Sequence, residues 1–272
     1  MKPRRSLAEL MGNVDYALAR QVESAGEVAG PELSIVIPAY NEEERLPRTV
    51  LNLLHWARDT QLDCEVVISD DGSTDRTLEV SKRLASTSDR IVVLTNVHKG
   101  KGAAVRLGML NARGRNVLFM DADGATPLTE IDKLLQSLAN GADVAVGSRV
   151  ATMPGQIRVE TSFLRQAIGR TFALLVNLCA VQGINDTQCG FKMFKAECLQ
   201  SIFSRQKLDG FAFDVEILYL AKKMGLRIEE VPVNWYTQAG SKVNLVLDPL
   251  KMFCDILKIR FLHLRLNSAS DR

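Results

Sequence analysis

The sequence lacks a long run of apolar residues, although 46% of its 272 residues are hydrophobic. A membrane-spanning helix needs about 20 consecutive apolar residues. The nearest stretch, Phe172 to Val181, is shorter and is interrupted by Asn177. The basic amino end precedes no continuous apolar segment either, because Glu9 and Asp15 interrupt the residues after it. We therefore expect neither a transmembrane helix nor a signal peptide.

The sequence also lacks a large excess of charge of one sign, and its cysteines are not arranged in pairs. The formal net charge of +2 is too small for the concentrated basic surface that nucleic-acid binding usually needs. Nucleic acid is therefore not an expected partner. The five cysteines are odd in number and include no Cys-x-x-Cys pair. This pattern argues against a disulfide framework and a structural zinc site, and it favours a reducing location on the cytoplasmic side.

Apolar strands and amphipathic helices alternate along the chain after residue 32. The expected strands are 33–37, 65–69, 91–94, 117–120 and 144–146, and the expected helices are 46–58, 77–85, 103–111 and 128–139. This alternation predicts an α/β fold with a mostly parallel central sheet flanked by helices. Ligands of such sheets bind beyond the carboxyl ends of the strands. Polar loops follow four of these strands, at residues 38–44, 70–75, 96–102 and 121–127.

Two carboxylates end the fourth expected strand. Residues two apart in extended backbone point the same way, so Asp121 and Asp123 can face one small volume. Carboxylate oxygens suit a hard cation such as Mg²⁺ or Mn²⁺, whose other ligands would be water and substrate phosphates. An isolated acid-x-acid triplet is more often a solvated turn, but the neighbouring polar loops favour a shared nucleotide site.

These loops together resemble the family 2 glycosyltransferases with the GT-A fold. The resemblance rests on residues 38–42, 70–75 and 121–123, which are similar to the family's nucleotide loops and metal triplet. Within the family, residues 121–126, 147–149, 186–192 and 240–242 resemble dolichyl-phosphate β-glucosyltransferases and other polyprenyl-phosphate glycosyltransferases. The resemblance implies an inverting, metal-dependent transfer of glucose from UDP-glucose to a polyprenyl phosphate.

The resemblance also implies roles for individual residues. Asp121 and Asp123 would hold Mg²⁺ or Mn²⁺, and the expected catalytic residues are Asp123, Arg149, Arg170 and Asp186. The UDP-sugar donor would be bound by Pro38, Tyr40, Glu42, Ile68, Asp70, Asp121, Ala122, Gln188 and Lys242. The related mannosyltransferases carry a glutamine where this chain has Ala125, which argues against a mannosyl donor.

The resemblance assigns phosphate contacts to the arginines and leaves two roles open for Asp186. Arg149 and Arg170 would meet the acceptor phosphate or the donor diphosphate, because a guanidinium presents a planar fork of donors. Lys242 would close over the diphosphate. Asp186 would position other groups, with a general base as the alternative. A phosphate acceptor is already an anion at neutral pH and needs no base.

The two ends of the chain are expected to lie outside the catalytic domain, which we place at residues 32–247. Residues 1–31 predict an amphipathic helix followed by a linker, and residues 248–272 predict a basic amphipathic helix from Asp248 to Leu266. Leu250, Phe253, Leu257, Phe261 and Leu264 share one face of that helix. Such a face can lie in a membrane interface or pack against the sheet. We expect peripheral association with the cytoplasmic side of a membrane.

Other functions are also compatible with these motifs. The same fold can use another sugar nucleotide, such as GDP-mannose or UDP-GlcNAc, or a hydroxyl acceptor in polysaccharide or glycolipid synthesis. A nucleotidyltransferase is less favoured, because no strong glycine-rich triphosphate loop lies near the amino end. A non-catalytic, membrane-associated scaffold is least favoured, because the charged residues of the motifs are present.

Overall fold

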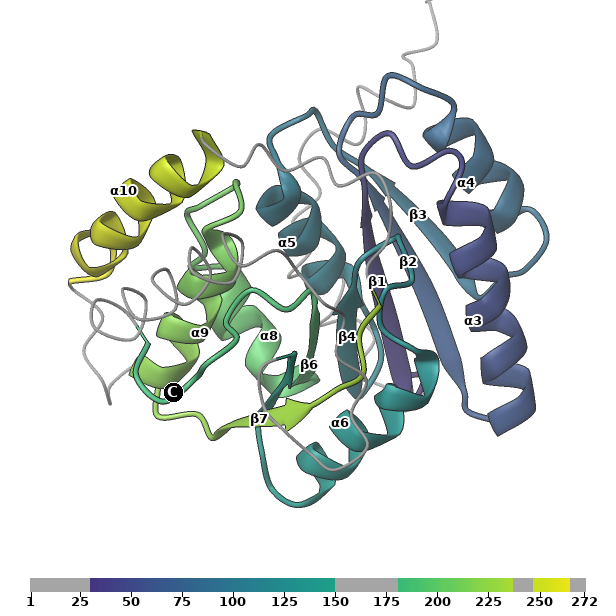
Figure 1. Cartoon of the computed structure of the whole chain (residues 1–272). Coiled ribbons are helices and arrows are strands. Elements are labelled where there is room, and N and C mark those ends of the chain that lie inside the picture. Colours follow the sequence, from purple (N-terminus) through teal and green to yellow (C-terminus); the bar gives the residue numbers. More distant parts are fainter. Residues whose placement is uncertain (1–29, 150–180, 237–246, 265–272) are drawn as a thin grey trace, which may run out of the picture. The chain divides into compact units, whose positions relative to one another are not determined.

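A mixed sheet lies at the centre of the residues that the computed structural model describes, which are 30–149, 181–236 and 247–264, with backbone alone for 247–254. Its strands are β1 Leu33–Ala39, β2 Cys64–Asp70, β3 Ile91–Thr95, β4 Asn116–Met120, β5 Val144–Ser148, β6 Phe191–Lys195 and β7 Ile228–Pro232. They lie in the order β3-β2-β1-β4-β6-β5-β7 (Figure 1). Strand β6 is antiparallel to β4 and β5, and the other neighbours are parallel.

Helices cover both faces of this sheet. They are α3 Leu46–Thr60, α4 Thr77–Ala85, α5 Lys101–Asn111, α6 Ile131–Ala139, α8 Ala196–Phe203, α9 Phe213–Lys223 and α10 Leu247–Leu262. Helices α3, α4 and α6 pack on one face, and α5, α8, α9 and α10 pack on the other. The strands therefore have apolar side chains on both faces, as parallel sheets covered by helices require.

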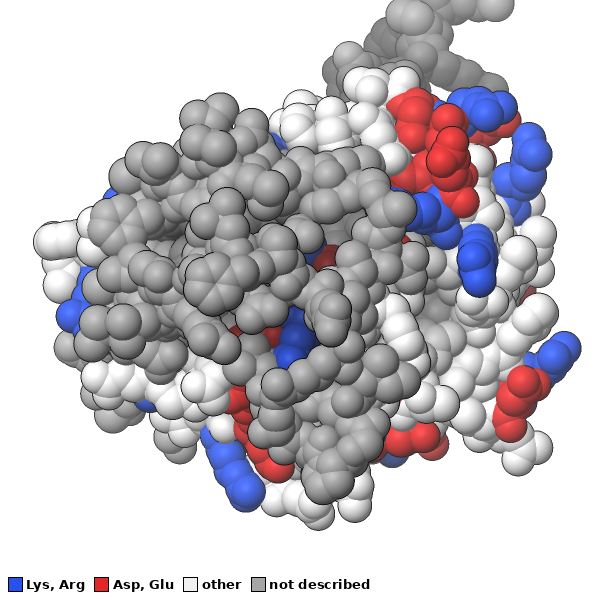
Figure 2. All heavy atoms as spheres, viewed as in Figure 1, with Lys and Arg blue, Asp and Glu red and all other residues white. Residues whose placement is uncertain are grey.

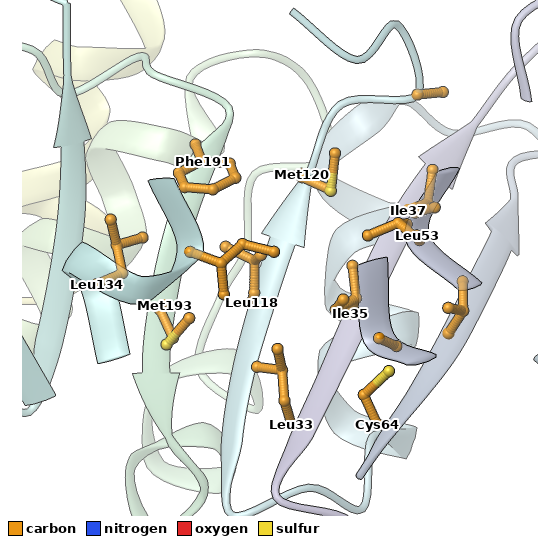
Figure 3. Packing of buried hydrophobic residues seen from close by; sticks show 14 of the residues in the cluster. Leu33, Ile35, Ile37, Leu53, Cys64, Leu118, Met120, Leu134, Phe191 and Met193 are labelled. Atoms are coloured by element: carbon orange, nitrogen blue, oxygen red, sulfur yellow. The ribbon is translucent and has the colours of Figure 1, made fainter. Parts of the chain in front are cut away.

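The alternation of side chains along each strand divides the core into two clusters. In β1, Leu33, Ile35 and Ile37 point toward α3, whereas Val36 points toward α5. Figure 3 shows the first cluster, in which side chains of β1, β4 and β6 meet those of α3 and α6. On the opposite face, a Cβ added to Gly108 of α5 would lie 2.3 Å from Cγ1 of Val36. Only glycine therefore allows α5 to approach β1 this closely.

The five expected strands and four expected helices are present, with small differences at their ends. The segment expected as one helix, 128–139, is a 3₁₀ turn at Leu128–Glu130 followed by α6. Four elements were not predicted, namely β6, α8, α9 and β7. Strand β6 is hard to recognise in the sequence because Lys192 interrupts its apolar residues, yet Lys192 is wholly buried.

The carboxyl-terminal helix differs from its prediction in its ends and in the face that packs. Helix α10 spans Leu247–Leu262, so it begins one residue before the predicted cap, Asp248, and ends before Leu266. Its inner face buries Ile256 and Ile259 in the core. His263, just beyond its end, lies 2.7 Å from the buried Glu216 of α9. The face that the sequence predicted to be apolar is a different one. Its residues Leu257, Phe261 and Leu264 are exposed and lie on the outer side of the helix.

Candidate active site

One small cavity lies at the carboxyl ends of β4 and β5. Asp121 and Asp123, which follow β4, and Arg149, which follows β5, all line this cavity of about 70 Å³. Its other lining residues are Met120, Ala125, Thr126, Cys189, Gly190, Phe191 and Trp235. The cavity therefore combines two carboxylates with a guanidinium, and its walls come from four separate parts of the chain.

Asp121 is held by the residue just before β6, the strand that pairs with β4 in the antiparallel direction. Its backbone N–H donates to the carbonyl of Gly190 at 3.2 Å. A Cβ added to Gly190 would lie 2.3 Å from Oδ2 of Asp121, so only glycine leaves room for this carboxylate. On the opposite side, Nζ of Lys101 lies 2.5 Å from Oδ1 of Asp121.

Asp123 lies in the turn after β4, and local hydrogen bonds fix that turn. Its Oδ1 accepts the backbone N–H of Ala125 at 3.0 Å, and the buried hydroxyl of Thr49 donates to the carbonyl of Ala122 at 2.7 Å. Burial, followed by the negative charge of Asp121, raises the pKa of Asp123. A cation bound between the two carboxylates would relieve this repulsion.

The donor set fits a hard divalent cation that is completed by other ligands. No group of three or more His, Cys, Asp or Glu side chains that could hold a metal occurs within residues 30–149, 181–236 and 255–264. Two protein carboxylates with remaining positions for water and phosphate are typical of Mg²⁺ sites that act on nucleotides. The residues present therefore fit Mg²⁺ or Mn²⁺.

Arg149 and Asp186 form a close ion pair beside the cavity. The backbone N–H and Nε of Arg149 donate to Oδ2 of Asp186 at 2.9 and 2.7 Å, and Nη2 donates to Oδ1 at 2.8 Å. Although burial opposes the charged form, the adjacent guanidinium lowers the pKa of Asp186. The guanidinium carbon also lies 5.6 Å from the ring centroid of Trp235. Asp186 is therefore ionised at neutral pH, with both oxygens engaged.

The last residue of β2 carries a buried acceptor atom that lacks a partner among the described residues. Asp70 is 1% exposed, and its Oδ2 accepts the backbone N–H of Ser73 at 3.2 Å. Its Oδ1 has no hydrogen-bond partner in the described part of the chain. A buried acceptor of this kind is costly unless a ligand or water donates to it. Ile68 and Pro38 are buried close by in the paired strands β2 and β1.

An aromatic pair joins the loops that follow β1 and β3. The rings of Tyr40 and His98 are stacked, with their centroids 4.1 Å apart and their planes inclined by 20°. Nδ1 of His98 lies 2.8 Å from Oδ2 of the buried Asp71, which follows Asp70. Asp71 also accepts the backbone N–H groups of Lys99 and Gly100 at 3.1 and 2.7 Å. The loops after β1, β2 and β3 are thus joined through side chains.

Glu42 forms an ion pair within its own loop and a backbone hydrogen bond to α4. Its two carboxylate oxygens accept from Nε and Nη2 of Arg45 at 2.7 and 2.8 Å, and its backbone N–H donates to the hydroxyl of Thr77 at 2.7 Å. Glu43 forms a second ion pair with Arg76 at 3.0 Å. Figure 2 shows acidic and basic side chains gathered around the first turns of α3 and α4, the part of the molecule that contains these pairs.

The sequence did not assign roles to several residues that the fold brings to this region. Lys101 and His98 lie in the polar segment 96–102, and Gly190 lies in the motif 186–192, so the sequence pattern indicated a functional segment for each of them. Trp235 had no such signal. Ala122 is buried between the two carboxylates, and Gln188 is half-buried on the loop of Asp186. The predicted residues Arg170 and Lys242 lie outside the described residues, as does the predicted helix within residues 1–31.

Comparison with known proteins agrees with the resemblance seen in the motifs. Residues 34–203 match glycosyl transferase family 2. The chain is 38% identical to the dolichyl-phosphate beta-glucosyltransferase of Homo sapiens, with 86% of this chain and 76% of the human protein covered. It is 34% identical to the protein of the same name from Saccharomyces cerevisiae, with 85% of this chain and 75% of the yeast protein covered.

Solved structures share the fold at lower identity. Glucosyl-3-phosphoglycerate synthase from Mycobacterium tuberculosis, crystallised with Mn²⁺, UDP and glucosyl-3-phosphoglycerate, gives a TM-score of 0.61 at 20% identity. The match covers 95% of this chain and 84% of that one. Mannosyl-3-phosphoglycerate synthase from Rubrobacter xylanophilus gives 0.64 at 20% identity, covering 91% and 77%.

These matches confirm the predicted GT-A fold and the predicted enzyme class. The family match extends over more than half of the chain, and the curated relatives extend the similarity to most of its length. The chain is therefore a glycosyltransferase that belongs to glycosyl transferase family 2.

Proposed function

We propose that this protein transfers glucose from UDP-glucose to a polyprenyl phosphate, with inversion at the anomeric carbon and with Mg²⁺ or Mn²⁺ bound. The observation that carries the proposal is the cavity where Asp121 and Asp123 meet Arg149. It combines two carboxylates that can bind a cation with a guanidinium, whose planar donor group suits phosphate. We call the two carboxylates, Asp121 and Asp123, the cation seat. The names of the curated relatives support glucose as the sugar and dolichyl phosphate as the acceptor.

The donor nucleotide would lie along the carboxyl ends of β1, β2 and β4. The unpartnered Oδ1 of Asp70 can accept an N–H of the base, and the aromatic pair of the half-buried Tyr40 and the exposed His98 offers a stacking surface. Asp121 and Asp123 would hold the cation against the diphosphate. When bound, the cation supplies the charge that stabilises the departing UDP.

The acceptor phosphate would meet Arg149, which Asp186 and Trp235 hold in place. Both oxygens of Asp186 accept from Arg149 and its pKa is lowered, so it is a poor general base. This favours an acceptor that is already an anion over a hydroxyl acceptor. A phosphate oxygen would then attack the anomeric carbon from the face opposite UDP. Arg170 and Lys242 stay proposed phosphate contacts.

The outer face of α10 supports peripheral association with a membrane, which we place on its cytoplasmic side. Phe261 is 74% exposed, and Leu257 and Leu264 lie on the same exposed face, flanked by the exposed Lys258 and Arg260. Apolar side chains flanked by basic ones suit the interface of an anionic bilayer. No described helix has the length and apolar character that crossing a membrane requires.

Flotation with vesicles tests the membrane contact. We expect the protein to float with phosphatidylglycerol-containing vesicles and the Phe261→Glu variant to remain largely unbound. Flotation of that variant to the same extent as the unchanged protein would contradict a role for α10.

A panel of donors tests the transfer itself. UDP-glucose, UDP-galactose, UDP-GlcNAc and GDP-mannose are each incubated with a short polyprenyl phosphate, with and without Mg²⁺. We expect metal-dependent glucolipid from UDP-glucose alone. Product from another donor would show that the enzyme transfers a different sugar. UDP release without lipid product would favour a hydroxyl acceptor.

The Asp123→Ala variant tests the role of the cation. We expect it to lose transfer while it stays folded, because one of the two carboxylates of the cation seat is removed. The matched control is Asp132→Ala, which removes an exposed carboxylate of α6 that does not line the cavity and should retain activity. Near-normal transfer by Asp123→Ala would exclude the proposed metal role.

A further inference from the structure

Lys101 is the one lysine side chain in the described residues that pairs with Asp121. It is the first residue of α5, and its Nζ lies 2.5 Å from Oδ1 of Asp121. Its side chain is 22% exposed. A divalent cation held by the carboxylate of Asp121 would be close to this ammonium group, and two cations at a partly buried site repel each other strongly.

The backbone that carries Lys101 is fixed on both sides. The N–H of Gly102 donates to the carbonyl of Asp209 at 2.7 Å. A Cβ added to Gly100 would lie 2.6 Å from that same carbonyl oxygen, and Gly100 has a φ of +126°, which favours glycine. The start of α5 is therefore packed directly against the loop that precedes α9. The ammonium group can therefore leave Asp121 by rotation of its side chain, without movement of the backbone that carries it.

Lys101 carries a positive charge at neutral pH, as lysine side chains ordinarily do. Its ammonium is paired directly with the carboxylate of Asp121. Asp214 of α9, another acidic residue of this region, is buried and contacts the buried ammonium of Lys192. The ammonium of Lys101 therefore remains a permanent positive charge next to the proposed cation seat.

We propose that Lys101 competes with the metal ion for Asp121, and that the diphosphate of the donor relieves this competition. The inference rests on the cation seat of the proposed function. The anionic diphosphate offers the ammonium a new partner and offers the metal further oxygen ligands. Metal and nucleotide thereby assist each other's binding, and the assistance is equal in both directions because coupling free energy is reciprocal.

The test measures Mn²⁺ binding without turnover, by electron paramagnetic resonance of free Mn²⁺ in the presence and absence of UDP. We expect UDP to lower the Kd for Mn²⁺ of the unchanged protein by at least about tenfold, given the repulsion between neighbouring cations. In Lys101→Met we expect the Kd without UDP to be at least about tenfold lower than in the unchanged protein. The further effect of UDP should then be smaller.

Two variants serve as controls, and a third repeats the test. Lys101→Arg retains the charge and should behave like the unchanged protein. Lys99→Met removes an exposed lysine two residues earlier and should also leave Mn²⁺ binding unchanged. Lys101→Gln retains a group that can donate to Asp121, so it gives a second neutral variant if Lys101→Met does not fold.

Two outcomes would overturn the inference, and they are distinguishable from each other. If both neutral variants bind Mn²⁺ with the same or a higher Kd than the unchanged protein, Lys101 does not compete with the metal, although the cation seat stands. If the unchanged protein binds no Mn²⁺ even with UDP, the cation seat of the proposed function fails, and the inference fails with it.

Discussion

Replacing Asp186 with asparagine tests the ion pair that positions Arg149. The change removes the negative charge and leaves one oxygen where the carboxylate accepts three N–H groups of Arg149. Hydrogen bonds to charged groups contribute about 1.5 to 3 kcal/mol each, and loss of one partner of a buried pair costs about 3 to 5 kcal/mol. Since the Arg149 side chain is 35% exposed, water partly compensates its charge. We therefore expect a loss of about 3 kcal/mol, at the lower end of that range.

The assay is unfolding by urea and by heat at neutral pH. For a domain of this size, a loss of about 3 kcal/mol corresponds to a fall in Tm of about 6 to 12 °C. The matched control is Asp59→Asn, because Asp59 lies 3.4 Å from Arg58 and both side chains are mostly exposed. Exposed pairs contribute about 0 to 1 kcal/mol, so the control should unfold almost like the unchanged protein. Equal stability of the two variants would refute the reasoning.

The pH dependence gives the same prediction a second, independent check. Arg149 lowers the pKa of Asp186 in the folded protein from its ordinary value of 3.8. A lowered pKa in the folded state contributes stability that is present above the unfolded-state value and is lost as the pH falls through the folded-state value. The difference between the unchanged protein and Asp186→Asn should hold from pH 7 to pH 5 and shrink below about pH 4. A difference that already vanishes near pH 6 would show a raised pKa, as a general base would have.

Two further changes test the packing around the site. Gly190→Ala should reduce metal-dependent transfer by at least about tenfold, because its Cβ would lie 2.3 Å from Oδ2 of Asp121. Gly210→Ala, where an added Cβ meets nothing within 4 Å, should leave transfer unchanged, and equal activity of the two variants would contradict the steric argument. Burial raises the pKa of Cys189 to about 12 and that of Cys198 to about 11. Iodoacetamide at pH 8 should therefore spare both thiols in the folded protein and modify both in urea, and labelling of Cys189 in the folded protein, detected by peptide mass spectrometry, would be inconsistent with its burial.

The sequence by itself determined the first half of the fold and the presence of two carboxylates just after β4. Period-two and period-3.6 patterns indicate which face of each segment is apolar, and these patterns depend only on neighbouring residues. They predicted the strands from β1 to β5 and the helices α3 to α6. The spacing of Asp121 and Asp123 predicted that they face one small volume, and both line the cavity, although Asp123 lies in a turn after β4 and not in extended backbone.

Only the tertiary structure decided which distant side chains meet these carboxylates. The insertion of β6 between β4 and β5 brings Gly190 against Asp121, and no local pattern encodes that strand order. Arg149 and Asp186 lie 37 residues apart, and their pairing depends on how β5 and the loop before β6 come together. The contact of Lys101 with Asp121 likewise joins the start of α5 to the loop after β4. Periodicity specifies local backbone and apolar faces, whereas contacts between distant charged groups arise only when the packed sheet brings their loops to one edge.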